Sequence, residues 1–382
     1  MKKNWVIFLF FVIIVFIVRL PSLFQSRIIH DEALYLLVGR SILEGNPPYV
    51  EVWDNKPPGL FVIYAIALKV FGNSVVSIWI IACIAVIVTC FLLYLTGKVL
   101  FKTQGDQIGL IAGIFYAIFT LINGGIGAQA EIFFIPPVVL AFYLLFSGKK
   151  IYSEKLMSFN NFGFLGMGLS IGVAAQIKYL VVFDFIALLI IIAKDIYSKY
   201  SRERIQFLLS KIIRHFTLVG SGVILVFSGT FFYFLYNGYF HEYFYATLLF
   251  HRQYVGTAEF SLIHFIGSLG GQVVRHFILY FSLFITPIFL YANNLNYSKA
   301  KKNIVYLIIW FLITFMATLI SKRYYGHYFL QLLPPLCLVS SYVVTRTFYS
   351  SREFTKVKQR LILIPVTLGL LVSSHQLSIQ SM

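Results

Sequence analysis

Long runs of apolar residues constrain this chain more than any other feature. A bilayer offers no water to the backbone, so runs that enter it must form helices or a closed barrel. Their length, without a period-two alternation of polar and apolar positions, predicts helices. We therefore expect an all-α, polytopic membrane protein with about eleven transmembrane helices, at residues 5–23, 75–97, 107–123, 131–147, 162–177, 179–193, 216–236, 273–291, 304–321, 328–345 and 361–377.

Composition supports this class and excludes others. The chain of 382 residues is 59% hydrophobic and 12% charged, whereas a soluble domain is about 25% charged. Its net charge of +17 lies in short loops between apolar runs, which indicates membrane topology and not nucleic-acid binding. The three cysteines lie within apolar runs and lack metal-ligand spacing, which argues against a disulfide framework or a cysteine metal site.

Residues 59–71 form a further apolar stretch whose position decides the topology. The stretch is only about 13 residues long, whereas a helix needs roughly 20 to cross the bilayer directly. If it lies in the interface, 21 of the 31 lysines and arginines fall on the cytoplasmic side, as the positive-inside rule requires. We therefore predict a cytoplasmic N-terminus and a long external loop at residues 19–74 with juxtamembrane helices. The first run has no signal cleavage site after it and is kept as a helix, and residues 1–382 are expected to form a single membrane domain.

Charged residues gather in this external loop. Asp31 and Glu32 precede a helix-like stretch at residues 33–43, and Asp54 and Lys56 precede Pro57-Pro58. Each has an ordinary structural interpretation, because acidic residues cap helix N-termini and complement the helix dipole, and Asp is common in turns.

Other charged residues are predicted to reach the same membrane face. Glu131 stands at the outer start of the fourth predicted span, where it would also suit a helix N-terminus. Lys178 and Arg323 lie at helix ends, where lysine and arginine often extend toward the interface. These cations lie on the side that the topology rule disfavours, which points toward a site.

Four motifs in order carry a resemblance to a known family: Asp31-Glu32 before a Tyr-containing helix, Asp54-Asn55-Lys56-Pro57-Pro58-Gly59, Gln129-Ala130-Glu131, and the run from Tyr325-Gly326-His327 to Pro334-Pro335. Over roughly residues 5–345 the pattern resembles the GT-C glycosyltransferases, in the bacterial branch related to protein O-mannosyltransferases and lipid A aminoarabinose transferases. The resemblance implies a bundle of membrane helices, with juxtamembrane helices in the first external loop, that uses a polyprenyl-phosphate sugar as donor. It also implies a bacterial plasma (inner) membrane, with the active site external or periplasmic.

The resemblance also implies residue roles. The acidic residue at the position of Asp31 is the catalytic base in that family, and the lysine before Pro-Pro, here Lys56, lies close to the donor phosphate. Many members of that family have Glu immediately before that lysine, whereas this chain has Asn55 there and Asp54 one place earlier. Tyr325 and His327 are candidates for lining the donor site, and interfacial anchoring is their alternative.

These residues predict an inverting glycosyltransferase acting on an acceptor hydroxyl. A phosphate leaving group needs little proton donation, so one base and some cations suffice. The predicted catalytic group is Asp31, Glu32, Asp54 and Glu131; the predicted phosphate-binding group is Lys56, Lys178, Arg323, His327 and Tyr325. No cofactor is certain, although converging carboxylates permit a divalent cation.

The main alternative is a transporter or flippase for a lipid-linked sugar, which would place polar groups near the bilayer midplane on interrupted helices related by repeats. A noncatalytic membrane scaffold is a third possibility, against which the charged motifs argue. The sugar and the acceptor, whether lipid, glycan or protein, do not follow from the sequence.

Overall fold

A computed structural model describes residues 2–21, 30–148, 157–250, 261–292, 299–320 and 322–350. Every helix or strand assigned in these ranges is a helix, which confirms the all-α class. The chain divides into two compact units, each described here by itself. Unit 1 comprises Met1–Val18, Thr89–Ile126 and Phe260–Met382, and unit 2 comprises Arg19–Val88 and Gly127–Glu259.

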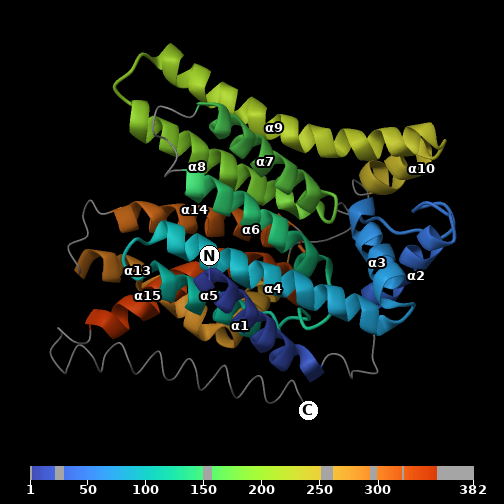
Figure 1. Cartoon of the computed structure of the whole chain (residues 1–382), viewed down its shortest axis with the longest axis horizontal. Helices are drawn as coiled ribbons and strands as arrows, with labels where there is room; N and C mark the ends of the chain where they lie inside the picture. The colour runs from blue at the N-terminus through green and yellow to red at the C-terminus, as the bar shows by residue number, and fades with distance from the viewer. Residues whose placement is uncertain are drawn as a thin grey trace. The chain divides into compact units, whose positions relative to one another are not determined.

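Unit 2 contains the predicted external loop and the middle of the chain. In it α7 packs against both α6 and α9, and α2 packs against α3 (Figure 1). Its elements are α2 (His30–Leu43), α3 (Pro58–Phe71), α6 (Ala130–Gly148), α7 (Met157–Ala175), the short η2 (Tyr179–Val181), α8 (Val182–Tyr200), α9 (Ile205–Tyr236), α10 (Phe240–Phe244) and the π-helical turn η3 (Tyr245–Leu249).

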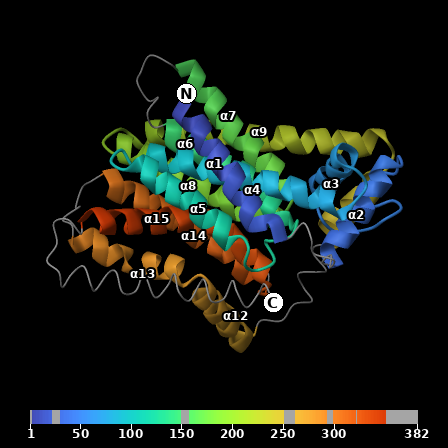
Figure 2. The ribbon, with the colours of Figure 1, turned by 60° about the horizontal axis from the view of Figure 1, so that its bottom comes forward.

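Unit 1 is built around α15, which packs against α5, α13 and α14 (Figure 2). The long helix α4 (Val75–Leu100) belongs to unit 2 up to Val88 and to unit 1 beyond it. The other elements of unit 1 are α1 (Lys2–Arg19), α5 (Gly105–Phe119), α12 (Leu262–Arg275), α13 (Phe277–Ala292), α14 (Lys299–Ile320), η4 (Gly326–Leu332) and α15 (Leu333–Ser350).

Five described helical segments are long and apolar enough to cross a membrane: Val75–Leu100, Ala130–Gly148, Ile205–Tyr236, Ala300–Ile320 and Gly326–Phe348. A sixth candidate is the pair α12 and α13, which meet at a 94° bend. The protein is therefore an integral membrane protein. The count of eleven stays a prediction, because other apolar helices are shorter and the span predicted at 361–377 lies outside the described residues.

The two helices predicted in the external loop are present. Helix α3 begins at Pro58, where proline's fixed φ and missing N–H suit the first turn. It ends before Gly72, whose φ of 97° few other residues adopt. Each of α2 and α3 has 14 residues, which is about 21 Å of helix and less than the roughly 30 Å of hydrocarbon in a bilayer.

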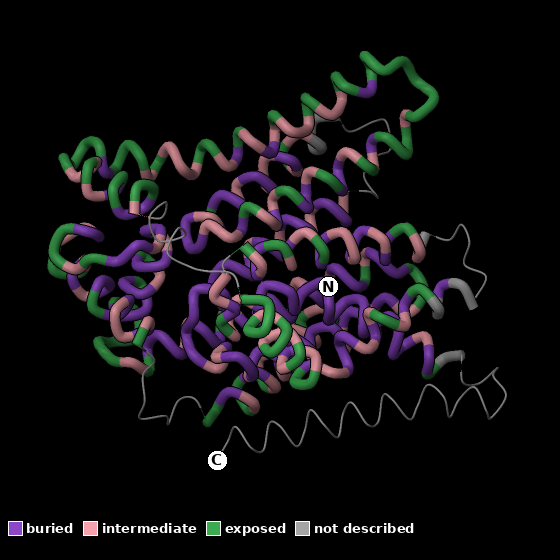
Figure 3. The backbone as a smooth tube through the Cα atoms, turned by 180° about the vertical axis from the view of Figure 1, so that it is seen from behind, coloured by how far each residue is buried: buried purple, intermediate pink, exposed green. Residues whose placement is uncertain are grey.

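The helix boundaries differ most around α9, which begins at Ile205 and not near residue 216. The predicted loop at 194–215 is therefore mostly helix, with α8 ending at Tyr200. A helix can continue past the hydrocarbon because its hydrogen bonds are internal, and its charged residues then face water. Only 17% of the most apolar window of α9 is buried, and Figure 3 shows exposed and intermediate positions along most of the helix, as expected for contact with lipid.

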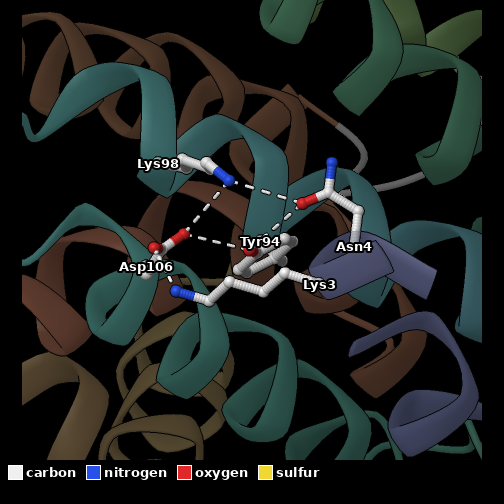
Figure 4. Close-up of polar contacts among 5 residues, drawn as sticks. All are labelled: Lys3, Asn4, Tyr94, Lys98 and Asp106. Carbon is white, nitrogen blue, oxygen red and sulfur yellow. Dashed lines mark hydrogen bonds and ion pairs between the residues drawn. The ribbon is translucent and has the colours of Figure 1, made fainter. Parts of the chain in front are cut away.

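A polar cluster ties three elements of unit 1 together (Figure 4). Lys3, at the start of α1, lies 2.7 Å from a carboxylate oxygen of Asp106, at the start of α5. Lys98, near the end of α4, lies 3.3 Å from the same carboxylate, and the Tyr94 hydroxyl donates to it at 2.9 Å. Lys98 also donates to Asn4 at 3.3 Å. The N-terminus of α1 and the α4–α5 connection therefore lie side by side.

Candidate active site

Six of the nine predicted site residues belong to unit 2, and each lies at the end of a helix or in a turn. Asp31 and Glu32 are in the first turn of α2, which begins at His30, so Asp31 lies inside the helix and not at the position before it. Glu131 is in the first turn of α6, as predicted. The other three are in turns: Asp54 and Lys56 before α3, and Lys178 immediately before η2.

A buried ion pair joins two of these elements. The Lys178 ammonium donates to Oε1 of Glu131, and the two side chains are 10% and 1% exposed. Burial lowers the pKa of Lys178, and the neighbouring Glu131 carboxylate opposes this shift. Such a pair is stable only while both partners remain, because either charge alone would be buried without compensation.

The turn before α3 holds a second buried charge. Asp54 is 7% exposed and accepts a hydrogen bond from the backbone N–H of Asn55. Burial raises the pKa of Asp54, while the Lys56 ammonium and backbone N–H groups oppose the shift. Lys56 itself is half-buried and donates to the Asn55 amide oxygen at 3.1 Å. The neutral Asn55 amide therefore orients the lysine without neutralising it.

The first turn of α3, just after Lys56, touches the turn that carries Lys178. A Cβ at Gly59 would lie 2.6 Å from the backbone oxygen of Gln176, so only glycine permits this approach. Lys56 lies close enough to Lys178 to favour the loss of its proton, which is the effect of one cation on another. An anion bound between the two ammonium groups would relieve that repulsion.

Three carboxylates lie near enough to one buried tyrosine to act on it. Tyr35, on α2, is 2% exposed, and burial raises its pKa, with further contributions from Asp31, Asp54 and Glu131. Asp31 also acts on Lys178. Three carboxylates and two lysines from four separate segments thus lie within electrostatic reach of one another. The sequence did not single out Tyr35 as a site residue, although it stands in the helix that follows the Asp31-Glu32 motif.

Glu32 differs from its neighbour Asp31, because its side chain is buried beneath the connection that leads into α6. Its Oε1 accepts a hydrogen bond from the Ala128 N–H at 2.8 Å. A Cβ at Gly127 would collide with this carboxylate, so a larger residue there would displace the Glu32 side chain. The Arg19 guanidinium and the Tyr64 hydroxyl donate to the carbonyls of Gly127 and Ala128, at 3.2 and 2.7 Å. These hydrogen bonds fix the backbone at Ala128, three residues before Glu131.

Arg323, Tyr325 and His327 belong to unit 1 and are described within it. The segment before η4 has Lys322 and Tyr324 at φ of 53° and 51°, which non-glycine residues rarely adopt. The rings of Tyr325 and His327 stack with centroids 5.6 Å apart, and Tyr325 is 47% exposed. The structure thus assigns these three residues to unit 1 and the other six to unit 2.

A metal site of the usual kind is not seen in the described part of the chain. No three His, Cys, Asp or Glu side chains there come together as ligands for a metal ion. The carboxylates of unit 2 are near enough to influence one another electrostatically but do not form such a group. The divalent cation considered above therefore has no assigned ligands.

The fold and these contacts describe an integral membrane protein in which buried charged residues lie beside short helices of the first long loop. Residues 55–219 match the family described as dolichyl-phosphate-mannose-protein mannosyltransferase. No curated protein sequence matches the chain.

Two solved structures extend the similarity over most of the chain. One is ArnT from Cupriavidus metallidurans bound to undecaprenyl phosphate, with a TM-score of 0.65 and 15% identity, covering 91% of this chain and 61% of that one. The other is the archaeal oligosaccharyltransferase AglB from Archaeoglobus fulgidus, in complex with an inhibitory peptide and a dolichol-phosphate. Its TM-score is 0.60 at 12% identity, and the match covers 98% of this chain and 56% of that one.

An oligosaccharyltransferase of Archaeoglobus fulgidus in complex with Zn and sulfate also matches, with a TM-score of 0.55 at 13% identity, and the match covers 96% of this chain and 51% of that one. The chain shares the fold of these solved structures, which confirms the GT-C resemblance at the level of the fold. It spans less than two thirds of the length of these solved proteins.

Proposed function

We propose that this protein is an inverting glycosyltransferase that moves a sugar from a polyprenyl-phosphate donor to an acceptor hydroxyl at the outer face of the membrane. The observation that carries the proposal is the pair of lysines held together in unit 2, beside three carboxylates and short interfacial helices. Two like charges held close together repel each other unless a ligand of opposite charge binds to both. A lipid phosphate is such a ligand, and the fold matches structures solved with lipid phosphates.

In the proposed reaction the acceptor oxygen attacks the anomeric carbon of the sugar from the side opposite the phosphate. The bond between that carbon and the phosphate oxygen breaks, and the polyprenyl phosphate leaves with the bonding electrons. The acceptor proton passes to the Asp31 carboxylate, which is half-exposed and can reach an incoming hydroxyl. Attack from the opposite side inverts the anomeric centre. A well-placed base contributes about 10²–10⁴-fold.

The two lysines differ in how directly each could bind the phosphate. Lys178 is already paired with Glu131, so it contributes charge from within a buried pair. Lys56 donates only to the neutral Asn55 amide among the contacts described, and it is the proposed direct ligand. Asp54 and Glu131 are proposed to position the acceptor or Asp31. Binding of the donor by Arg323, Tyr325 and His327 is a further part of the proposal and rests on the sequence resemblance alone.

The outer-face direction draws support from the polar cluster of unit 1. Lys3 and Asp106 form an ion pair, so the N-terminus and the α4–α5 connection share one membrane face. If α1 and α4 each cross once, residues 20 and 75 share the opposite face. Helices α2 and α3 then make no net crossing, as expected for two helices too short to span. The positive-inside rule puts Lys3 in the cytoplasm and the site outside. On this proposal the membrane is the plasma membrane of a bacterial cell.

A comparison of cell envelopes tests this proposal. Lipids and glycans would be analysed by mass spectrometry in cells lacking the protein and in the same cells supplied with wild type or Asp31→Asn. We expect one sugar mass to be absent from an acceptor in the first strain, restored by wild type and not by the variant. Restoration by a well-expressed Asp31→Asn protein would remove Asp31 as the base. An envelope unchanged by loss of the protein would contradict the glycosyltransferase function.

A further inference from the structure

An aromatic cluster lies behind the turn that carries Lys56. Tyr49 is 4% exposed, and its ring centroid lies 6.0 Å from that of Phe61 on α3 and 5.8 Å from that of Phe234 on α9. It also lies 6.3 Å from Tyr243 on α10, which stacks on Phe234 at 4.6 Å with an interplanar angle of 8°. The cluster therefore joins the first external loop to the chain segment that follows α9.

Tyr49 is held in an unusual backbone conformation. Its φ is 75°, in the left-handed region that costs energy for a residue with a large side chain. In this conformation its ring is buried and its hydroxyl donates to the backbone oxygen of Lys56 at 2.7 Å. The strained residue thus fixes the backbone of the proposed phosphate ligand, just ahead of Pro57-Pro58.

The segment after α10 contacts both lysine-bearing turns. The π-helical turn η3 places Thr247 in the interior, 2% exposed, where a hydrogen bond joins its side chain to that of Tyr179. Tyr179 immediately follows Lys178. Beyond the turn, the ring of Phe250 meets that of Trp53 edge to face at 4.7 Å. One short segment therefore reaches the neighbour of Lys178 and the turn that leads to Lys56.

The π-helical turn explains how one segment makes both contacts. A π-turn bonds residue i to i+5, one residue more than an α-turn. Removing one residue would let the segment close as an α-helix and would rotate everything beyond it by about 100° relative to Thr247. The contacts of Thr247 and Phe250 could then not form together. Such isolated π-turns in proteins occur frequently at functional sites.

We propose that Tyr49 and the segment 240–250 are positioning elements that hold Lys56 and Lys178 at the spacing a lipid phosphate requires. This inference rests on the proposed function and adds residues that no motif in the sequence indicated. Tyr49 acts through the backbone of Lys56 and Thr247 acts through Tyr179. Neither is a catalytic residue, because neither is proposed to touch the sugar or the phosphate.

The test is binding of undecaprenyl phosphate to the full chain in detergent, measured as a Kd, with the melting temperature recorded for each variant. Tyr49→Phe keeps the ring and removes the hydroxyl, and we expect a Kd raised by about 3–10-fold, the range for one lost hydrogen bond. Tyr236→Phe is the matched control, because Tyr236 is 92% exposed, and its Kd should not change. Deletion of Leu248 should raise the Kd more than 10-fold, and Leu248→Ala, at a position 56% exposed, should leave it unchanged.

A double-mutant comparison separates positioning from general loss of structure. If Tyr49 acts through Lys56, Tyr49→Phe should have no further effect on the Kd in a Lys56→Ala background. An equal loss in both backgrounds, or no loss in either, would overturn the inference. Wild-type protein that binds no undecaprenyl phosphate would contradict the proposed function itself. Binding by the wild type without coupling between Tyr49 and Lys56 would overturn only the positioning role.

Discussion

The buried pair of Glu131 and Lys178 allows a prediction whose size follows from the structure. In Lys178→Met the Glu131 side chain, 1% exposed, loses the ammonium with which it forms a buried ion pair. Removing one partner of a buried pair typically costs about 3–5 kcal/mol. For a unit of about 150–250 residues, each kcal/mol of lost stability lowers the melting temperature by about 2–4 °C. The melting temperature of Lys178→Met should therefore fall by roughly 6–20 °C.

The matched control is the exposed pair in unit 1. Lys3 and Asp106 are 67% and 34% exposed in their side chains, so water screens their attraction. Lys3→Met should therefore cost about 0–1 kcal/mol. The double variant Glu131→Gln with Lys178→Met removes both charges of the pair, and much of the lost stability should return.

Thermal unfolding in detergent, followed by the fluorescence of a thiol-reactive or tryptophan probe, measures all four proteins under one condition. Sugar transfer should be low in both Lys178→Met proteins, whatever their stability, because the charge beside Lys56 is gone. If Lys178→Met melts no lower than Lys3→Met, the pair is not buried as described. If the double variant melts no higher than Lys178→Met, charge compensation is not the cause of the loss.

Three further predictions concern other groups. Burial raises the pKa of Asp54, so the folded protein keeps this proton to a higher pH than the unfolded chain, and stability falls as pH rises through that interval. Asp54→Asn should therefore melt higher than wild type near neutral pH, with the difference shrinking toward about pH 4, and a variant that melts lower at neutral pH would refute this. Lys56→Ala should weaken use of the lipid donor by about 1.5–3 kcal/mol, seen as a raised KM that Lys56→Arg partly restores; unchanged kcat and KM would remove Lys56 from the site. Lys102→Cys and Arg202→Cys should resist an impermeant thiol reagent added outside intact cells, and labelling of either would reverse the topology.

Much of the fold follows from local sequence signals. Apolar length locates most helices, and Pro57-Pro58 with Gly72 delimits α3 to within one residue of the predicted start. The start of α9 was missed by about eleven residues, because its first turns are amphipathic and carry Lys211 and Arg214. Apolar length marks only the part of a helix that lies in hydrocarbon.

The sequence predicts which residue types form the candidate site. It does not predict which of these residues contact one another. Asp31, Asp54 and Lys56 lie near one another in the sequence beside recognisable turns. The pairing of Glu131 with Lys178 joins residues 47 positions apart, and no local pattern encodes that distance. Glu32 looks equivalent to Asp31 in sequence, and only the fold shows its carboxylate holding the Ala128 N–H. Tyr49 carries no signal for its left-handed conformation, because such signals come from glycine, asparagine or aspartate.

The central claim is that this chain transfers sugar from a lipid phosphate, and the most direct measurement is release of polyprenyl phosphate by the purified protein in detergent. Donor-loaded membrane extracts would supply sugar-linked lipid and acceptor, and mass spectrometry would follow the sugar-free lipid phosphate with time. Detergent removes the two sides of the membrane, so a transporter or flippase would release none. We predict release by wild type and a rate at least about 10²-fold lower for Asp31→Asn. That substitution should cost the fold only about 0.3–1 kcal/mol, for the charge at the first turn of α2. Equal release by wild type and variant, or none by wild type when donor and acceptor are both present, would contradict the account.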